Sequence, residues 1–288
     1  MYIKNHKCGS CRLTCVDKPG ALFATNQNWD KLLWQAPTKS HPGLPLIPPI
    51  IHTIGSLLQT GVDWEAWIPR IYKIRRPDRS VSKSTFVAAH GYSPDSYLAS
   101  LWENRGEYWD YYKQFDLVFT PNFSIYDNAP RLEQLINMYR TTKCYAEMVD
   151  AGLPVVLDVS WGQTVDIDRW IEYINLVHPP AISMSLQGIA GVKLSKDWIM
   201  VAMGYSLILQ NIPKDISVIF VGVGSQSRAK MVRELVGDSE RNIHWMNTVA
   251  YMQSRYGRLW DGKKADNSLS RDEVFEISAR GMILNAKG

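Results

Sequence analysis

From residue 85 onward, the sequence alternates short apolar segments with longer amphipathic ones, and this alternation constrains the fold more than any other feature. The short segments are rich in β-branched and aromatic residues and are predicted to be strands at residues 85–89, 117–120, 155–159, 181–185, 218–223 and 242–247. Successive segments begin about 25 to 40 residues apart, which leaves room for a helix in each connection. The pattern therefore predicts parallel βαβ units.

Helix start and stop signals between the predicted strands agree with this interpretation. In the clearest case, Asp127 and Pro130 mark a helix start, apolar residues follow at helical spacing, and Gly152 and Pro154 end the helix. The chain has 288 residues, which is sufficient for one α/β barrel of about 200 to 250 residues. We predict an α/β fold of the TIM-barrel type, complete or irregular, over residues 81–288. Residues 1–80 are predicted to form an amino-terminal metal-binding extension that packs on this barrel.

Three of the four cysteines lie within the first fifteen residues, in the spacing C-x2-C-x3-C. A two-residue gap lets the thiolates of Cys8 and Cys11 share one metal, and the next gap brings Cys15 to the same place. The sequence therefore predicts a metal site, with Cys144 as the fourth ligand. Three histidines are alternatives to Cys144: His6, His41 and His52. The opposing interpretation is a set of thiols that bind nothing.

The predicted metal is an iron–sulfur cluster of the 4Fe–4S type rather than zinc. Zinc sites are more often built from paired C-x2-C units, whereas three clustered cysteines fit a cluster whose last iron is open or bound by a distant residue. The order of the gaps is the reverse of the C-x3-C-x2-C order in radical S-adenosylmethionine enzymes, which argues against that chemistry.

Polar residues follow each predicted strand, at the end where parallel barrels carry their active sites. Tyr92 and Asn122 are examples. Asp158 lies inside its strand, where a buried carboxylate needs partners or has a raised pKa, so it is the first catalytic candidate. His90 and Asp127 are the other candidates, as groups that could transfer protons. Each has a structural alternative, since carboxylates also fix loop amides and histidines are often held by hydrogen bonds.

A glycine-rich segment joins the predicted strand at 218–223 to a following helix. Backbone amides at such a junction can bind an anion, and a phosphate is the natural ligand. The cofactor-binding candidates are Gly222, Gly224, Ser225 and Arg228, of which Arg228 could add a bidentate contact. The segment lacks the G-x-G-x-x-G pattern of dinucleotide-binding folds, and glycines also serve simply to turn a chain sharply.

Composition limits the cellular setting. No stretch approaches the roughly 20 uncharged apolar residues of a membrane span, so no membrane partner is expected. The amino terminus lacks a basic and then apolar signal segment, which predicts the cytoplasm of a bacterial host. A basic segment at residues 73–83 could neutralise phosphates of a nucleic acid, or could be a solvated surface loop.

Three motifs resemble those of a known family: TPNFSIYDNAPR at residues 120–131, NMYR at 137–140 and VLDVSW at 156–161. They are similar to the uncharacterised domain-of-unknown-function family four-four-one-seven, which occurs in phages and mobile elements. The resemblance implies a barrel-like α/β fold and no established activity. The chain is more weakly similar to guanine transglycosylases, barrels with two catalytic aspartates and a zinc site. That similarity implies that Asp158 acts together with Asp95 or Asp127.

These features predict a phage or mobile-element metalloenzyme that modifies or exchanges a nucleotide or nucleic-acid base. One alternative is a metalloprotein that binds nucleic acid without catalysis, through its cysteine-bound metal and its basic segment. Another is a phage factor that binds a host protein through its tryptophan-rich surface. The sequence makes no prediction of oligomeric state.

Overall fold

The structure is a computed structural model of the whole chain. It describes residues 32–35, 50–53, 87–92, 95–126, 128–186, 196–222, 232, 234, 241–247, 249, 253–254, 256–270, 273–275, 277–278 and 281.

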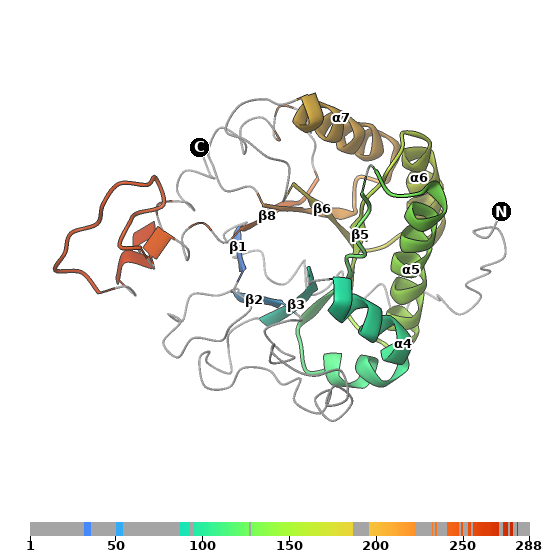
Figure 1. Cartoon of the computed structure of the whole chain (residues 1–288), viewed down its shortest axis with the longest axis horizontal. Helices are drawn as coiled ribbons and strands as arrows, with labels where there is room; N and C mark the ends of the chain where they lie inside the picture. The colour runs from blue at the N-terminus through green and yellow to red at the C-terminus, as the bar shows by residue number, and fades with distance from the viewer. Residues whose placement is uncertain are drawn as a thin grey trace.

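Within the described residues, eight parallel strands form a closed barrel in chain order (Figure 1). They are β1 (Leu32–Gln35), β2 (Ile50–Thr53), β3 (Val87–Gly91), β4 (Leu117–Pro121), β5 (Val155–Val159), β6 (Ala181–Ser185), β7 (Ser217–Val221) and β8 (Ile243–Asn247). Strand β8 pairs with β1 and closes the ring. An unbroken order of parallel neighbours requires a crossover after each strand, as the spacing of the apolar segments predicts.

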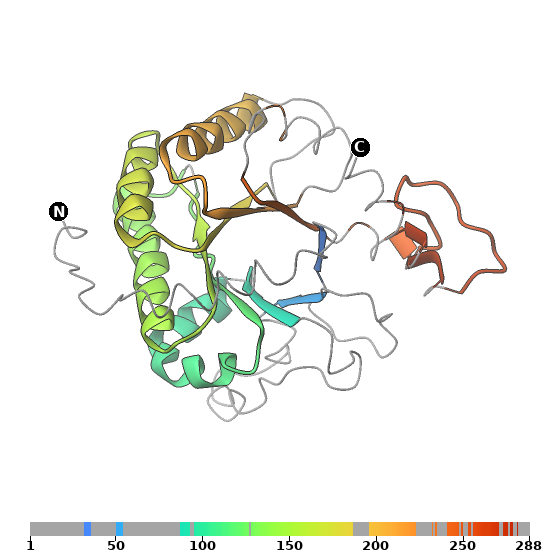
Figure 2. The ribbon, with the colours of Figure 1, turned by 180° about the vertical axis from the view of Figure 1, so that it is seen from behind.

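Four long helices cover the outside of the sheet between β3 and β7 (Figures 1 and 2). They are α4 (Asp95–Tyr112), α5 (Arg131–Asp150), α6 (Val165–Val177) and α7 (Lys196–Asn211). The helix expected after Pro130 is therefore present as α5. Among the helices that the structure describes, none combines the length and apolarity needed to cross a membrane.

The six predicted strands are confirmed as β3 to β8, with ends that differ from the predicted ones by no more than two residues. The first two strands of the barrel lie inside residues 1–80, where an extension is predicted. The barrel thus takes strands from both sides of residue 80. The remaining residues of 1–80 lie outside the described part of the chain, so the metal-binding extension stays a prediction.

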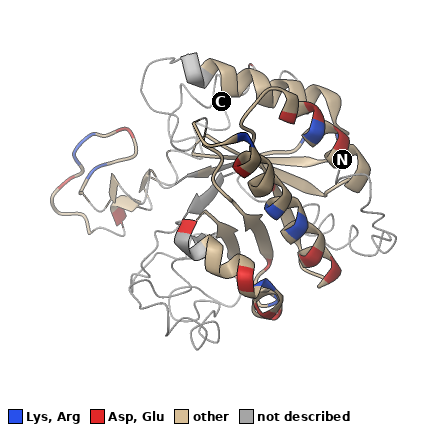
Figure 3. Cartoon of the chain, turned by 45° about the vertical axis from the view of Figure 1, so that its right-hand side comes forward, with Lys and Arg blue, Asp and Glu red and all other residues tan. Residues whose placement is uncertain are grey.

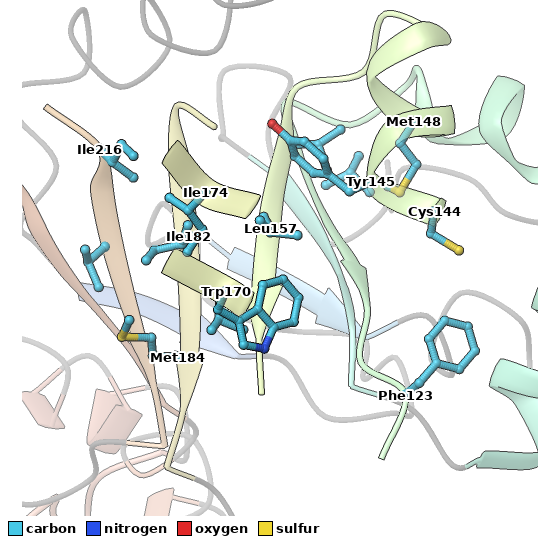
Figure 4. Close-up of a cluster of buried hydrophobic side chains, with 14 of the residues drawn as sticks. Phe123, Cys144, Tyr145, Met148, Leu157, Trp170, Ile174, Ile182, Met184 and Ile216 are labelled. Atoms are coloured by element: carbon cyan, nitrogen blue, oxygen red, sulfur yellow. The ribbon is translucent and has the colours of Figure 1, made fainter. Parts of the chain in front are cut away.

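Alternate residues of the strands face two different apolar clusters. In β5, Val155, Leu157 and Val159 pack between the sheet and the helices, in the cluster that Figure 4 shows with Trp170 of α6. Val156 belongs instead to a second cluster with inward residues of other strands. Because successive side chains point to opposite faces of a strand, Asp158 shares the inner face with Val156.

Charge is almost absent from the strands. Asp158 is the one Asp, Glu, Lys or Arg in the eight strands described. In Figure 3 the other charged residues of the described part lie on helices and connections. A lone carboxylate placed inside a barrel is costly unless it is hydrogen-bonded, so its surroundings need to be examined as a site.

Candidate active site

Asp158 is 1% exposed and accepts hydrogen bonds from three side chains on three other strands or strand ends. Its Oδ1 accepts from the hydroxyl of Tyr92 and from Ser183 Oγ at 2.7 Å, and its Oδ2 accepts from Asn122 Nδ2. Its own backbone amide donates to Thr120 Oγ1 at 2.9 Å. Residues from β3 to β6 thus meet at one carboxylate near the carboxyl end of the barrel.

The pairing of the strands explains how these groups come together. Asp158 and Ser183 are register partners on β5 and β6, so their inward side chains are neighbours. Tyr92 and Asn122 follow directly after β3 and β4. These two strands approach closely at Gly91, where an added Cβ would lie 2.4 Å from Pro121 Cα, so only glycine fits there.

Burial governs the electrostatics of the site. Loss of solvent raises the pKa of Asp158, and the hydrogen bonds from Tyr92, Asn122 and Ser183 oppose this shift without cancelling it. Burial, reinforced by the nearby Asp158 charge, also raises the pKa of Tyr92 well above its ordinary value. Tyr92 therefore stays protonated and acts as a hydrogen-bond donor, whereas the raised pKa of Asp158 makes its carboxylate take up a proton more readily than an exposed one.

His90 is fully buried on β3 and lies beside this network. Its Nδ1 accepts a hydrogen bond from the Tyr92 backbone amide at 3.2 Å. The His90 ring is 5.2 Å from the Tyr92 ring and 6.5 Å from the Phe119 ring, measured between centroids. This bond positions the backbone of Tyr92, and a role of His90 in proton transfer stays a prediction.

Two aromatic side chains, Trp161 and Tyr205, pack on each other in the apolar cluster between the sheet and the helices. Trp161 follows β5 and meets the Tyr205 ring edge to face, with 4.6 Å between centroids. The Tyr205 hydroxyl donates to the Ser185 carbonyl oxygen at 2.9 Å, and its pKa is raised by burial and by the charge of Asp158. At Gly204 an added Cβ would lie 2.3 Å from Trp161 Cζ2, so α7 packs directly on the indole.

A second buried carboxylate, Asp166, braces the loops that follow β4 and β5. Its side chain is fully buried and forms an ion pair with Arg131 at the start of α5 and another with Arg169 at 2.7 Å. It also accepts from the backbone amides of Gly162 at 3.2 Å and Gln163 at 3.0 Å. This brace fixes the loop that carries Trp161, and the sequence analysis did not single it out.

Several predicted site residues lie outside the described part of the chain: Asp127, Gly224, Ser225, Arg228, Cys8, Cys11 and Cys15. Gly222 is described, follows β7 and has a φ of 84°, a left-handed conformation that favours glycine. The anion site and the amino-terminal metal site therefore stay predictions. Among the residues that are described, no group of three or more His, Cys, Asp or Glu side chains is placed to hold a metal ion.

Cys144, the predicted fourth ligand, lies on the inner face of α5 near Met148 (Figure 4). It is fully buried, and burial raises the pKa of its thiol. Metals bind the thiolate, which this position disfavours. The position of Cys144 therefore argues for a core residue, whereas the three-cysteine site, with an open last position or a histidine ligand, stays a prediction.

Ser183 is the member of the network that the sequence analysis missed, because it lies within a strand and not after one. Tyr92 and Asn122 are recognised there as residues at strand ends, without their link to Asp158. The sequence signal that could have linked Ser183 to Asp158 is the position of each residue within its predicted strand. Ser183 is the third residue of β6, a strand that also ends in a serine, and Asp158 is the fourth residue of β5 and its one polar residue.

A closed parallel barrel with a polar centre near its carboxyl end defines an α/β protein of the TIM-barrel type. The chain belongs to the family described as Domain of unknown function (DUF4417), whose model matches residues 68–235. This confirms the resemblance carried by the three motifs. The similarity to guanine transglycosylases is not confirmed.

Two kinds of similar protein accompany the family match. The Gene 1 protein of Mycobacterium phage L5 is 28% identical over 110 residues, which cover 38% of this chain and 47% of that protein, so the match spans about half of the relative. A putative fructose-1,6-biphosphate aldolase from Coccidioides immitis gives a TM-score of 0.49 at 11% identity, with 94% of this chain and 96% of that chain covered. The YdjI aldolase from Escherichia coli K12 gives a TM-score of 0.46 at 11% identity, with coverage of 94% and 97%.

Proposed function

We propose that this protein is an enzyme that carries out acid–base chemistry on a nucleotide or nucleic-acid base, with Asp158 as the proton acceptor. The observation that carries the proposal is the placement of the one charged strand residue, buried near the carboxyl end of a parallel barrel and bonded to Tyr92, Asn122 and Ser183. In barrel enzymes the catalytic residues occupy this end.

The raised pKa of Asp158 supports this role. A carboxylate of ordinary pKa is a weak base at neutral pH, whereas one destabilised by burial takes up a proton more readily. The three donors orient the carboxylate without supplying a full positive charge, so it remains reactive. Tyr92 holds Oδ1 and is a positioning residue in this scheme.

Three features support a nucleotide or nucleic-acid base as the substrate. Trp161 provides a half-buried aromatic surface in the loop directly after β5. Gly222, with its left-handed backbone, begins the segment for which a phosphate site is predicted. The similar Gene 1 protein belongs to a phage, and a phage setting for this chain makes nucleic-acid chemistry a natural activity. The metal site at Cys8, Cys11 and Cys15 is a separate proposal.

The test is to incubate the protein with each nucleoside monophosphate and with a short oligonucleotide, and to analyse the nucleosides by liquid chromatography and mass spectrometry. Asp158→Asn should lower any conversion by about 10²-fold or more, the loss typical of a missing acid–base group. Asp215→Asn is the matched control, since Asp215 pairs with His178 and precedes β7, at the other end of the barrel. Undiminished conversion by Asp158→Asn would overturn the role of Asp158. An unchanged nucleoside composition with every substrate would overturn the substrate class.

A further inference from the structure

The hydrogen bonds of Asp158 leave one acceptor position open. An ionised carboxylate offers about four lone-pair positions, two on each oxygen. Oδ1 accepts from both Tyr92 and Ser183, whereas Oδ2 accepts from Asn122 alone among the described residues. For the residues that the structure describes, the open position is therefore on Oδ2, next to the Asn122 amide.

Asn122 adds a second acceptor beside the first. A carboxylate can only accept, so the amide must direct Nδ2, and not Oδ1, toward Asp158. Within the described part of the chain, no donor reaches Asn122 Oδ1, and the residue is partly exposed. Nδ2 and Oδ1 are bonded to the same carbon, so Asn122 Oδ1 lies beside the hydrogen bond that Nδ2 donates to Asp158 Oδ2. The described residues leave both oxygens, Asp158 Oδ2 and Asn122 Oδ1, able to accept a further hydrogen bond.

The charge of Asp158 also lacks a counter-ion in the described part of the chain. Its hydrogen-bond donors are a phenol, an alcohol and an amide, all neutral, and no ion pair involves it. This contrasts with Asp166 in α6, the other buried carboxylate of the described residues, which is paired with two arginines. Buried charges in proteins are normally paired, so a ligand that brings positive charge or N–H donors would complete the site.

We infer that the ligand of this site presents an amidine-type edge, two N–H groups on nitrogens that flank one carbon, with one N–H donated to Asp158 Oδ2 and the other to Asn122 Oδ1. This inference rests on the proposed function and specifies its substrate as a group rich in N–H donors. Such an edge occurs in amino-substituted nitrogen heterocycles and in guanidine groups. A carbonyl or phosphate group, which only accepts, would be repelled by both oxygens, so any phosphate of the substrate must lie elsewhere.

The test is a binding measurement with four small probes, by calorimetry or by NMR line shifts of the purified full chain. The probes are 2-aminobenzimidazole, benzimidazole without the exocyclic amine, methylguanidine and benzoate. We expect 2-aminobenzimidazole to bind at least about tenfold more tightly than benzimidazole, because only the former completes both hydrogen bonds. Benzoate should not bind. Methylguanidine binding as tightly as 2-aminobenzimidazole would assign the site to guanidine groups, and weaker binding would assign it to a heterocycle.

Three variants separate recognition from folding and from catalysis. Asp158→Asn should bind 2-aminobenzimidazole and benzimidazole about equally well, and Asn122→Ala should lose part of the preference for 2-aminobenzimidazole. Asp215→Asn, at the other end of the barrel, is the control that should keep the preference. Equal binding of the first two probes to the wild-type chain, or an unchanged preference in Asp158→Asn, would overturn the inference. Binding requires no turnover, so a preference without any nucleotide conversion would refute the proposed function and leave the recognition standing.

Discussion

The Asp158→Asn variant should change the way in which stability depends on pH. Burial raises the pKa of Asp158 in the folded protein above its ordinary value of 3.8, which the unfolded chain retains. Between these two pKa values, the folded protein binds more protons at Asp158 than the unfolded chain does. The free energy of unfolding therefore falls as the pH rises, by up to about 1.4 kcal/mol per pH unit. Asparagine does not titrate, so the variant lacks this decrease.

The measurement is denaturant unfolding of both proteins from about pH 4 to about pH 8, provided that unfolding is two-state. The difference in unfolding free energy, variant minus wild type, should rise with pH and become constant above the folded pKa of Asp158. All other titrating groups are common to both proteins and cancel. The changed contact with the Asn122 amide adds only a constant offset. Parallel stability curves for the two proteins would refute the argument that burial dominates this site.

Asp166→Asn is a control with the opposite sign. Burial works against the charged form of Asp166, but hydrogen bonds from Arg131 and from the Gln163 amide outweigh it and lower the pKa below the ordinary 3.8. The stability that this carboxylate contributes is present above pH 3.8 and is lost only as the pH falls through the lower folded value. The difference between Asp166→Asn and wild type should therefore be constant from about pH 5 to about pH 8.

Three further predictions concern packing and metal content. Gly204→Ala should lower the unfolding free energy by about 1–3 kcal/mol and shift tryptophan fluorescence; Gly106→Ala, whose Cβ would meet nothing within 4 Å, is the control that should not destabilise. Asp166→Ala should lower the free energy of unfolding, measured with denaturant, by about 3 kcal/mol. This is the low end for a broken buried ion pair, because both arginines are partly exposed. A loss under about 1 kcal/mol, roughly that of a surface ion pair, would contradict the role of Asp166 in bracing the loops. After anaerobic purification, Cys8→Ser should lower the iron or zinc content whereas Cys144→Ala should not, and the reverse result would restore Cys144 as a ligand.

The sequence predicts most of the barrel because its middle strands are buried on both faces. Strands β3 to β8 are short runs of apolar residues, and such runs are recognisable without knowledge of the fold. The first two strands carry a weaker signal, since LLWQ and IIHT stand in a proline-rich region with no flanking helical pattern. Their place depends on closure of the ring with β8, a tertiary constraint that local patterns do not contain.

The candidate site is predictable in part. Asp158 stands out as a carboxylate in an apolar strand, and Tyr92 and Asn122 stand out as polar residues at strand ends. Their convergence on one carboxylate depends on strand register and on the close approach of β3 and β4 at Gly91, which a sequence does not reveal. Ser183 illustrates the same limit, because its role follows only from its pairing with Asp158.

The contact between Trp161 and Gly204 links two positions that are far apart along the chain. An indole at 161 leaves no room for even a methyl group at 204. Among related sequences, a larger residue at 204 should therefore occur only together with a smaller ring or an aliphatic residue at 161. The packing of α7 on the loop after β5 is in this way inherited as a pair of residues, and not as either residue alone.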